Sequence, residues 1–191
     1  MADTLYGGRT FRTFNVIDEG NREVLGIEVA DSIPSLRVIR VMELIELYGK
    51  PQALRLDNGS EFTSIAFTEW CQEQGIELRF IQPGKPDQNA FIERFNKTYR
   101  DEVLDAYVFE SIDQVRAITE DWLHEYNEER PHDSLGRLRP LTFMPRRATA
   151  GKSTSSIQCN QTAQSRRDLL HDLFAIGLRE VSGHGEIALI L

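Results

Sequence analysis

Residues 54–96 read LRLDNGSEFTSIAFTEWCQEQGIELRFIQPGKPDQNAFIERFN. The short apolar run at 53–56 predicts a strand that delivers Asp57 to its C-terminal end, where an Asn-Gly pair turns the chain. The stretch ends in a predicted helix that carries Glu93, with 35 residues, 58 to 92, between the two carboxylates. These two acids form the candidate active site, because one is fixed at a strand end and the other on a helix.

Carboxylates that converge from separate elements are typical of metal-assisted phosphodiester chemistry. Two divalent ions about 3.5–4 Å apart can activate the attacking oxygen and stabilise the leaving oxygen, and Mg²⁺ prefers carboxylate ligands. A third carboxylate normally completes such a site. The structural alternative for Glu93 is an ion pair with Lys97 one helical turn away, which would stabilise an exposed helix by only ~0.3–0.5 kcal/mol.

From Leu5 to about Pro145 the chain resembles the catalytic core of a bacterial insertion-sequence transposase. This is the retroviral-integrase-like class, whose signature is Asp, Asp, a 35-residue gap and Glu. The matching segments occur in the family's order and at its spacing: LYGGRTFRTFNVIDEGNREVLGIEV, LRLDNGSEF, QPGKPDQNAFIERFN and YNEERPHDSL. The resemblance implies a ribonuclease-H-like α/β fold, a mixed sheet flanked by helices. It also implies that Asp57 and Glu93 bind Mg²⁺ or Mn²⁺ and catalyse the cutting and rejoining of DNA strands.

The resemblance further implies a DNA-contacting surface beside the two acids. The segment QPGKPDQN, residues 82–89, contains two prolines and a glycine and is expected to be a loop next to the active site. The following helix, about 88–104, has a predicted buried stripe and a separate polar face. The residues expected to contact DNA are Lys85, Gln88, Asn89, Arg94 and Lys97. An ordinary surface loop is the alternative interpretation of 82–89.

One departure from the family concerns its first catalytic Asp, which lies on the first strand just before the segment that matches MADTLYGG. Asp3 is about four residues from that position, or ~13 Å along a strand, which is too far for a simple replacement. We therefore expect a core truncated at its N-terminus, with an incomplete triad and little or no strand transfer. The first, central strand is expected to be missing, which would leave two unpaired strand edges. The alternative is a non-enzymatic DNA-binding or interfering remnant of a transposase.

Composition limits the other possibilities. With 191 residues, 40% of them apolar, the chain can form one sizeable core, and it has neither a membrane-length apolar run nor a secretory signal. A cytoplasmic bacterial protein is expected. The net charge of −8 argues against a nucleic-acid partner, but residues 134–167 contain seven basic and no acidic side chains. This basic segment is either a contact for DNA or a solvated linker.

The domain interpretation is a catalytic core at 1–147, a polar linker at 148–164 and a tail at 165–191. Within the tail, residues 165–178 could form one amphipathic helix. The expected partners are the DNA of the element ends and the target, and a second copy or an intact transposase, with no membrane. The remaining predicted elements are a hairpin at 9–17 and 22–29, a strand at 77–81, and helices at 32–48, 61–74 and 111–129.

Overall fold

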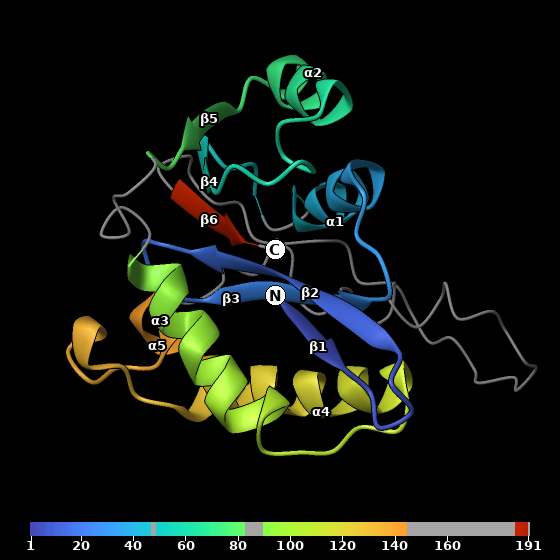
Figure 1. Ribbon diagram of the computed structural model, residues 1–191. Coiled ribbons are helices and arrows are strands. Elements are labelled where there is room, and N and C mark those ends of the chain that lie inside the picture. Colours follow the sequence, from blue (N-terminus) through green and yellow to red (C-terminus); the bar gives the residue numbers. More distant parts are fainter. Residues whose placement is uncertain (47–48, 83–89, 145–185, 191) are drawn as a thin grey trace, which may run out of the picture.

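The computed structural model (Figure 1) describes residues 1–46, 49–82, 90–144 and 186–190. Its strands are β1 Ala2–Thr4, β2 Thr10–Asp18, β3 Val24–Ala30, β4 Ala53–Leu56, β5 Glu77–Phe80 and β6 Glu186–Ile190. Its helices are α1 Ser35–Glu46, α2 Ile65–Gln74, α3 Ala90–Tyr99, α4 Ile112–His124 and α5 Pro140–Phe143. Shorter helical segments are π-helical Arg100–Leu104 and Glu125–Glu129, which continue α3 and α4, and the 3₁₀ segment Asp133–Leu135. No helix in these ranges is long and apolar enough to span a membrane.

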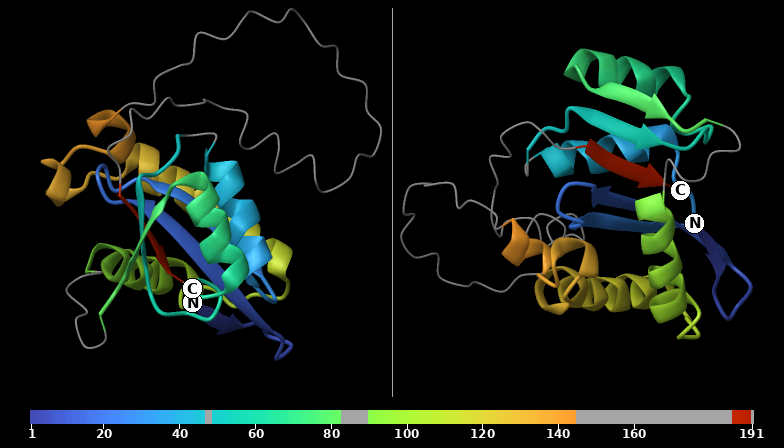
Figure 2. Two further views of the ribbon diagram at one scale, coloured as in Figure 1. Left: turned by 90° about the horizontal axis from the view of Figure 1, so that it is seen from above. Right: turned by 90° about the vertical axis from the view of Figure 1, so that its left-hand side faces the viewer.

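All the strands belong to one mixed sheet. Its order is β1-β2-β6-β4-β5, and β3 pairs with β2 as the antiparallel hairpin that the sequence predicts. The β4 and β5 strands run parallel, joined by α2. The helices α1 and α2 lie on one side of this sheet, and α3 and α4 lie on the other (Figure 2). The predicted α/β fold with a mixed sheet flanked by helices is therefore confirmed.

The centre of the sheet differs from the expectation. The predicted gap with two unpaired edges is absent, because β6 from the C-terminal tail lies between β2 and β4. It runs antiparallel to β2 and parallel to β4. Four of the five residues of EIALI are apolar, and Ile187 and Leu189, which lie two positions apart on one face of the strand, are buried in the core. The predicted linker and the predicted helix at 165–178 lie outside the described residues.

Two hydrophobic clusters, one on each side of the sheet, hold the layers together. One joins α1 and α2 to the inner faces of β2, β4 and β6. The other joins α3 and α4 to the hairpin and is built around four aromatic rings in mutual contact, those of Phe95, Tyr99, Trp122 and Tyr126. The predicted stripe of the α3 helix, Ile92, Phe95, Tyr99 and Val103, is buried. The second cluster therefore fixes the helix that carries Glu93.

Helix caps set the ends of the elements around the site. The helix predicted from residue 61 begins later, at Ile65, because the Ser64 side chain accepts a hydrogen bond from the backbone N–H of Phe67. It ends at Gln74 and is capped by Gly75, whose φ of 65° is the left-handed conformation that favours glycine. Residues 57–64 are consequently a loop, and that loop follows directly after β4.

Candidate active site

Asp57 lies directly after β4, as predicted, and is half-buried. Its side-chain conformation is fixed locally, because the backbone N–H of Gly59 donates a hydrogen bond of 3.0 Å to Oδ1. A Cβ atom at position 59 would lie 3.0 Å from the same oxygen, so only glycine fits there without displacing the carboxylate. The Asn-Gly turn therefore holds the candidate ligand in one place.

A second carboxylate, Glu61, lies beside Asp57 and was not among the predicted site residues. A Cβ atom at Gly59 would be 3.1 Å from Glu61 Oε2, so both acids approach this glycine. The other oxygen, Oε1, accepts a hydrogen bond of 2.7 Å from Arg12 on β2. The signal in the sequence was the spacing within DNGSE, which places the second acid on the same short loop.

The two acids have opposite electrostatic behaviour. Burial raises the pKa of Asp57, and the nearby charge of Glu61 raises it further, while the Gly59 N–H opposes the shift. Burial also acts to raise the pKa of Glu61, but hydrogen bonds from its own backbone N–H, Arg12 and Ser60 outweigh it and the pKa is lowered. The ionised form of Asp57 is thus the less favourable of the two carboxylates, and a bound cation would stabilise its negative charge.

This arrangement predicts that Asp57→Asn stabilises the metal-free protein near neutral pH. A carboxyl whose pKa is raised by folding costs stability once it ionises, so the benefit of asparagine should appear as the pH rises through the raised pKa. It should vanish below the ordinary value of 3.8. We expect a rise in the midpoint of thermal unfolding on the order of 1–3 °C, since partial exposure screens the charge. Thermal unfolding in a chelator across this pH range tests it, and a lower midpoint for Asp57→Asn would contradict it.

Glu93 lies in the first turn of α3 and is exposed, whereas Asn96 one turn later is buried against the sheet. The Asn96 Oδ1 accepts a hydrogen bond of 2.7 Å from Asn15 Nδ2 on β2, which anchors this half of the helix. Arg100, two turns after Glu93, donates hydrogen bonds to Asp3 Oδ2 at 3.3 Å and to the Ala2 carbonyl at 3.1 Å. The flank of α3 that carries Glu93 is therefore tied to β1.

Contacts around β1 connect the Asp57 loop with α3. Ala2 of β1 pairs with Arg12 of β2, and Arg12 holds Glu61. On its other side, β1 is bound by Arg100, the first residue of the π-helical segment that continues α3. A series of contacts through Arg12 and Ala2 thus links the Asp57 loop to Arg100, which lies two helical turns after Glu93. Asp3, the nearby acid, is engaged by Arg100 rather than directed to the candidate site.

The donors at this site are carboxylate oxygens, which are ligands that hard divalent ions prefer. Within the described ranges, no group of three or more His, Cys, Asp or Glu side chains is arranged to hold a metal. A fixed carboxylate beside a second acid nevertheless fits Mg²⁺ or Mn²⁺, since Mg²⁺ commonly keeps several waters and takes one or two carboxylates together with substrate phosphates. Asp57 and Glu61 are the two acids that the structure brings together, and Glu93 is the second ligand that the sequence predicts.

The predicted DNA-contacting residues fall into two groups. Lys85, Gln88 and Asn89 lie outside the described residues. Arg94 and Lys97 are exposed on α3, on either side of the buried Phe95 and Asn96. The helix therefore presents two cations to solvent next to Glu93.

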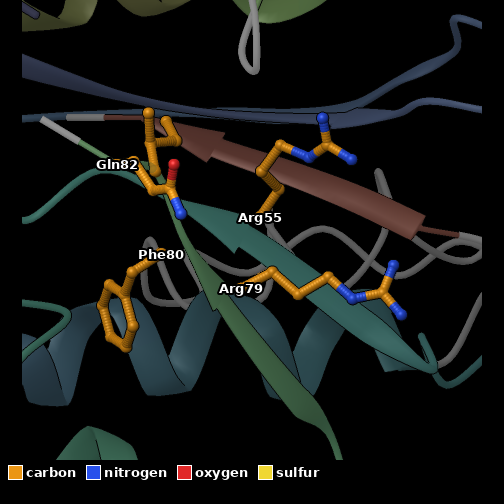
Figure 3. Close-up of a pocket in the computed structure, with 5 residues that line it drawn as sticks. Arg55, Arg79, Phe80 and Gln82 are labelled. Atoms are coloured by element: carbon orange, nitrogen blue, oxygen red, sulfur yellow. The ribbon is translucent and has the colours of Figure 1, made fainter. Parts of the chain in front are cut away.

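A cavity of about 250 Å³ lies next to the Asp57 loop, along β4 and β5 (Figure 3). Arg55 and Arg79 extend side by side there from neighbouring strands, in register. Each contacts an acid: Arg55 lies 3.5 Å from Glu19, and Arg79 lies 2.7 Å from Glu77. The remaining lining residues are Phe80, Ile81 and Gln82. Sequence analysis did not select these arginines, because a strand interior gave no reason to expect a basic cavity.

Comparison with known proteins relates this chain to a family. Two family models, both described as "Integrase core domain", match residues 2–86 and 74–140. The insertion element IS476 uncharacterized 39.2 kDa protein of Xanthomonas euvesicatoria is 43% identical over 74% of this chain and 41% of its own length. The insertion element IS407 uncharacterized 31.7 kDa protein of Burkholderia multivorans is 41% identical over 78% of this chain and 55% of its own length. The chain thus spans about half the length of these curated relatives.

The fold has counterparts among solved structures. One is the HTLV-2 integrase catalytic core domain, determined in complex with magnesium. The structural match covers 75% of this chain and 90% of that domain. Its TM-score is 0.59 at 18% sequence identity, which establishes a shared fold. The sequence matches and the shared fold agree with the predicted resemblance. This chain therefore belongs to the integrase core domain family, alongside proteins encoded by bacterial insertion sequences.

Proposed function

We propose that this chain is the core of an insertion-sequence transposase, with Asp57 and Glu93 as ligands for Mg²⁺ or Mn²⁺ and DNA as the substrate. The observation that carries the proposal is the fixed, half-buried carboxylate of Asp57, whose raised pKa indicates that its charge lacks compensation. Family membership supports the choice of reaction, which is cleavage and transfer of DNA phosphodiesters.

The roles of the side chains follow from their positions. Asp57 and Glu93 would hold the ion, and the charge of Glu61, which Arg12 holds in place, makes the ionised form of Asp57 unfavourable until a cation is bound beside it. The ion, when bound, supplies positive charge to phosphate oxygens as negative charge develops on them. Arg94 and Lys97 would contact the DNA backbone irrespective of sequence, with Lys85, Gln88 and Asn89 beside them in the neighbouring segment.

Two predicted carboxylates rather than three should hold the ion weakly, so we propose that this chain alone performs little or no strand transfer. The test is calorimetric titration of Mn²⁺ into the purified protein. Asp57→Asn and Glu93→Gln should each reduce the affinity at least tenfold, which corresponds to about 1.4 kcal/mol. The matched control is Glu69→Gln, an exposed acid on α2, which should leave binding unchanged. Equal binding in all four proteins would contradict the proposal.

The second candidate is a DNA-binding protein that does not need metal. The observations in its favour are the exposed cations of α3 and the basic cavity of Arg55 and Arg79. The net charge of −8 opposes it, so binding should be confined to this surface and sensitive to salt. Because the acids at the site would repel phosphate in the absence of metal, we place this candidate second.

We predict that Arg94→Ala combined with Lys97→Ala weakens binding of duplex DNA in a chelator about 10-fold or more at low salt. Removing two phosphate contacts should also reduce the slope of log affinity against log salt by about 1.8. A matched control is Arg40→Ala combined with Lys50→Ala, an exposed Arg of α1 and a Lys just beyond it. Fluorescence anisotropy measures both. Equal losses in the two double variants would mean that the contact surface is not on α3.

A further inference from the structure

The feature that carries this inference is the space between β2 and β4, which β6 occupies (Figure 1). On one side, residues Ile187 to Ile190 pair antiparallel with β2, from Asp18 to Asn15. On the other side, residues Glu186 to Leu189 pair parallel with β4. Both backbone edges of a five-residue segment are thus used, as they are when an extended peptide adds to a sheet. We call the space between β2 and β4 the strand slot.

Side chains fill the strand slot as well as backbone. Leu189 is 0% exposed and Ile187 is 4% exposed, and both belong to the cluster that includes Leu54 and Leu56 of β4. In register, Ile187 stands beside Leu54 and Leu189 beside Leu56. The slot therefore selects an extended segment with apolar residues two positions apart.

The register shows that β6 and β1 lie end to end along β2. Ile190 is opposite Asn15, and Ala2 is opposite Arg12, three positions further along the same strand. One partner strand thus serves two segments from opposite ends of the sequence, and the two views in Figure 2 show β6 between β2 and β4. Residues 5–9 join β1 to β2 directly, whereas β6 is far from both β2 and β4 in the sequence.

The separation in sequence indicates what holds β6 in place. In the chain, the described residue before β6 is Met144, so 41 residues, 145 to 185, intervene. Among the described residues, the contacts that hold this segment in place are the pairing with β2 and β4 and the burial of Ile187 and Leu189. A segment bound in this way can be replaced by an identical segment in trans.

We propose that the strand slot is a peptide-binding site whose occupant is the chain's own segment 186–190. The ligand class is an extended peptide with apolar residues at alternate positions, bound parallel to β4 and antiparallel to β2. Peptide binding in the strand slot does not involve metal binding by Asp57 and Glu93. The two proposals can therefore be tested independently. An empty slot would expose two sheet edges and an apolar cluster, which gives the protein a surface open to such segments.

The first experiment weakens the chain's own strand and supplies it as a peptide. A fluorescent peptide with the sequence of residues 184–191, HGEIALIL, is titrated with full-length protein and followed by anisotropy. Leu189→Asp protein should bind it at least 10-fold more tightly than the wild-type protein, because a charge at this buried position disfavours the internal strand. The matched control is Leu169→Asp, the same change elsewhere in the tail, which should behave like the wild type.

A second peptide, with Asp at the position of Leu189, tests whether binding in the slot requires the apolar side chain. Its affinity for Leu189→Asp protein should fall at least 10-fold. Equal affinity of the two peptides, or equal binding to the Leu189→Asp and Leu169→Asp proteins, would overturn the proposal.

A double-cysteine variant tests the proposal even if the Leu189→Asp protein does not fold. Ile17 and Ala188 are partners across β2 and β6, so Ile17→Cys with Ala188→Cys, in a Cys159→Ser background, should form a disulfide under mild oxidation. A cross-link within one chain supports the proposed occupant. A cross-link between two chains would overturn it in favour of a strand from a second copy, and failure to cross-link would mean that the slot does not hold segment 186–190.

Discussion

Phe95→Ala is expected to lower the free energy of unfolding by about 3–5 kcal/mol. Phe95 is 2% exposed and lies at the centre of the aromatic cluster, with its ring centroid 5.7 Å from that of Trp122 and 5.4 Å from that of Tyr126. The loss combines the buried surface of the ring with a cavity between α3 and α4 that rigid neighbouring rings cannot close. For a chain of this size, the midpoint of thermal unfolding should fall by roughly 6–20 °C.

The same substitution should also weaken metal binding, because Phe95 is two residues from Glu93 on α3 and fixes the orientation of that helix. The control is Phe91→Ala on the same helix. Phe91 is 45% exposed and packs under the Arg22 guanidinium, 3.3 Å from its ring centroid, so the loss there should be about 1 kcal/mol or less. Thermal unfolding monitored by circular dichroism compares them. Similar losses in the two variants would mean that the aromatic cluster does not hold α3.

The elements with strong local signals were predictable from the sequence. Periodic apolar residues predicted α3 and α4, and the Ser111 side chain does accept a hydrogen bond from the Gln114 N–H at the start of α4. The stop at Gly75 was predictable because the left-handed conformation there favours glycine. The occupant of the sheet centre was not predictable, since the pairing of β6 with β2 joins residues at opposite ends of the sequence and no local pattern specifies such a partner.

The candidate site shows the same division. Asp57 was identified from its place after a short apolar strand, and it does lie at that strand end. Glu61 was missed because its importance depends on Arg12, which is 49 residues away in the sequence. The Arg55 and Arg79 cavity was missed for a related reason: two arginines become neighbours only when β4 and β5 pair in register. The metal-binding roles of Asp57 and Glu93 remain predictions for the calorimetric test.

Asn127, the asparagine of the YNEERPHDSL segment, has a structural role that the sequence does not reveal. The residue is 7% exposed, in the π-helical turn after α4. Its Nδ2 donates to the Val24 carbonyl at 2.9 Å, and its Oδ1 accepts from the Val24 N–H at 2.9 Å. The pairing of β2 with β3 shifts register between Val16 and Ile17, near Val24, so the strand end needs a partner there. One side chain supplies both hydrogen bonds.

Asn127→Ala should therefore destabilise the protein by about 2–6 kcal/mol, since it leaves two buried backbone groups unpaired at about 1–3 kcal/mol each. Asn58→Ala, which removes one exposed hydrogen bond of 3.0 Å to the Ile81 carbonyl, should cost about 1 kcal/mol or less. Asn127→Asp separates hydrogen bonding from packing, because it keeps the shape but buries a charge and loses the donor. Its deficit should shrink as the pH falls and the carboxyl becomes protonated, whereas the deficit of Asn127→Ala should not depend on pH. Chemical denaturation across pH measures all three, and a pH-independent deficit for Asn127→Asp would show that the two bonds to Val24 are not what this residue contributes.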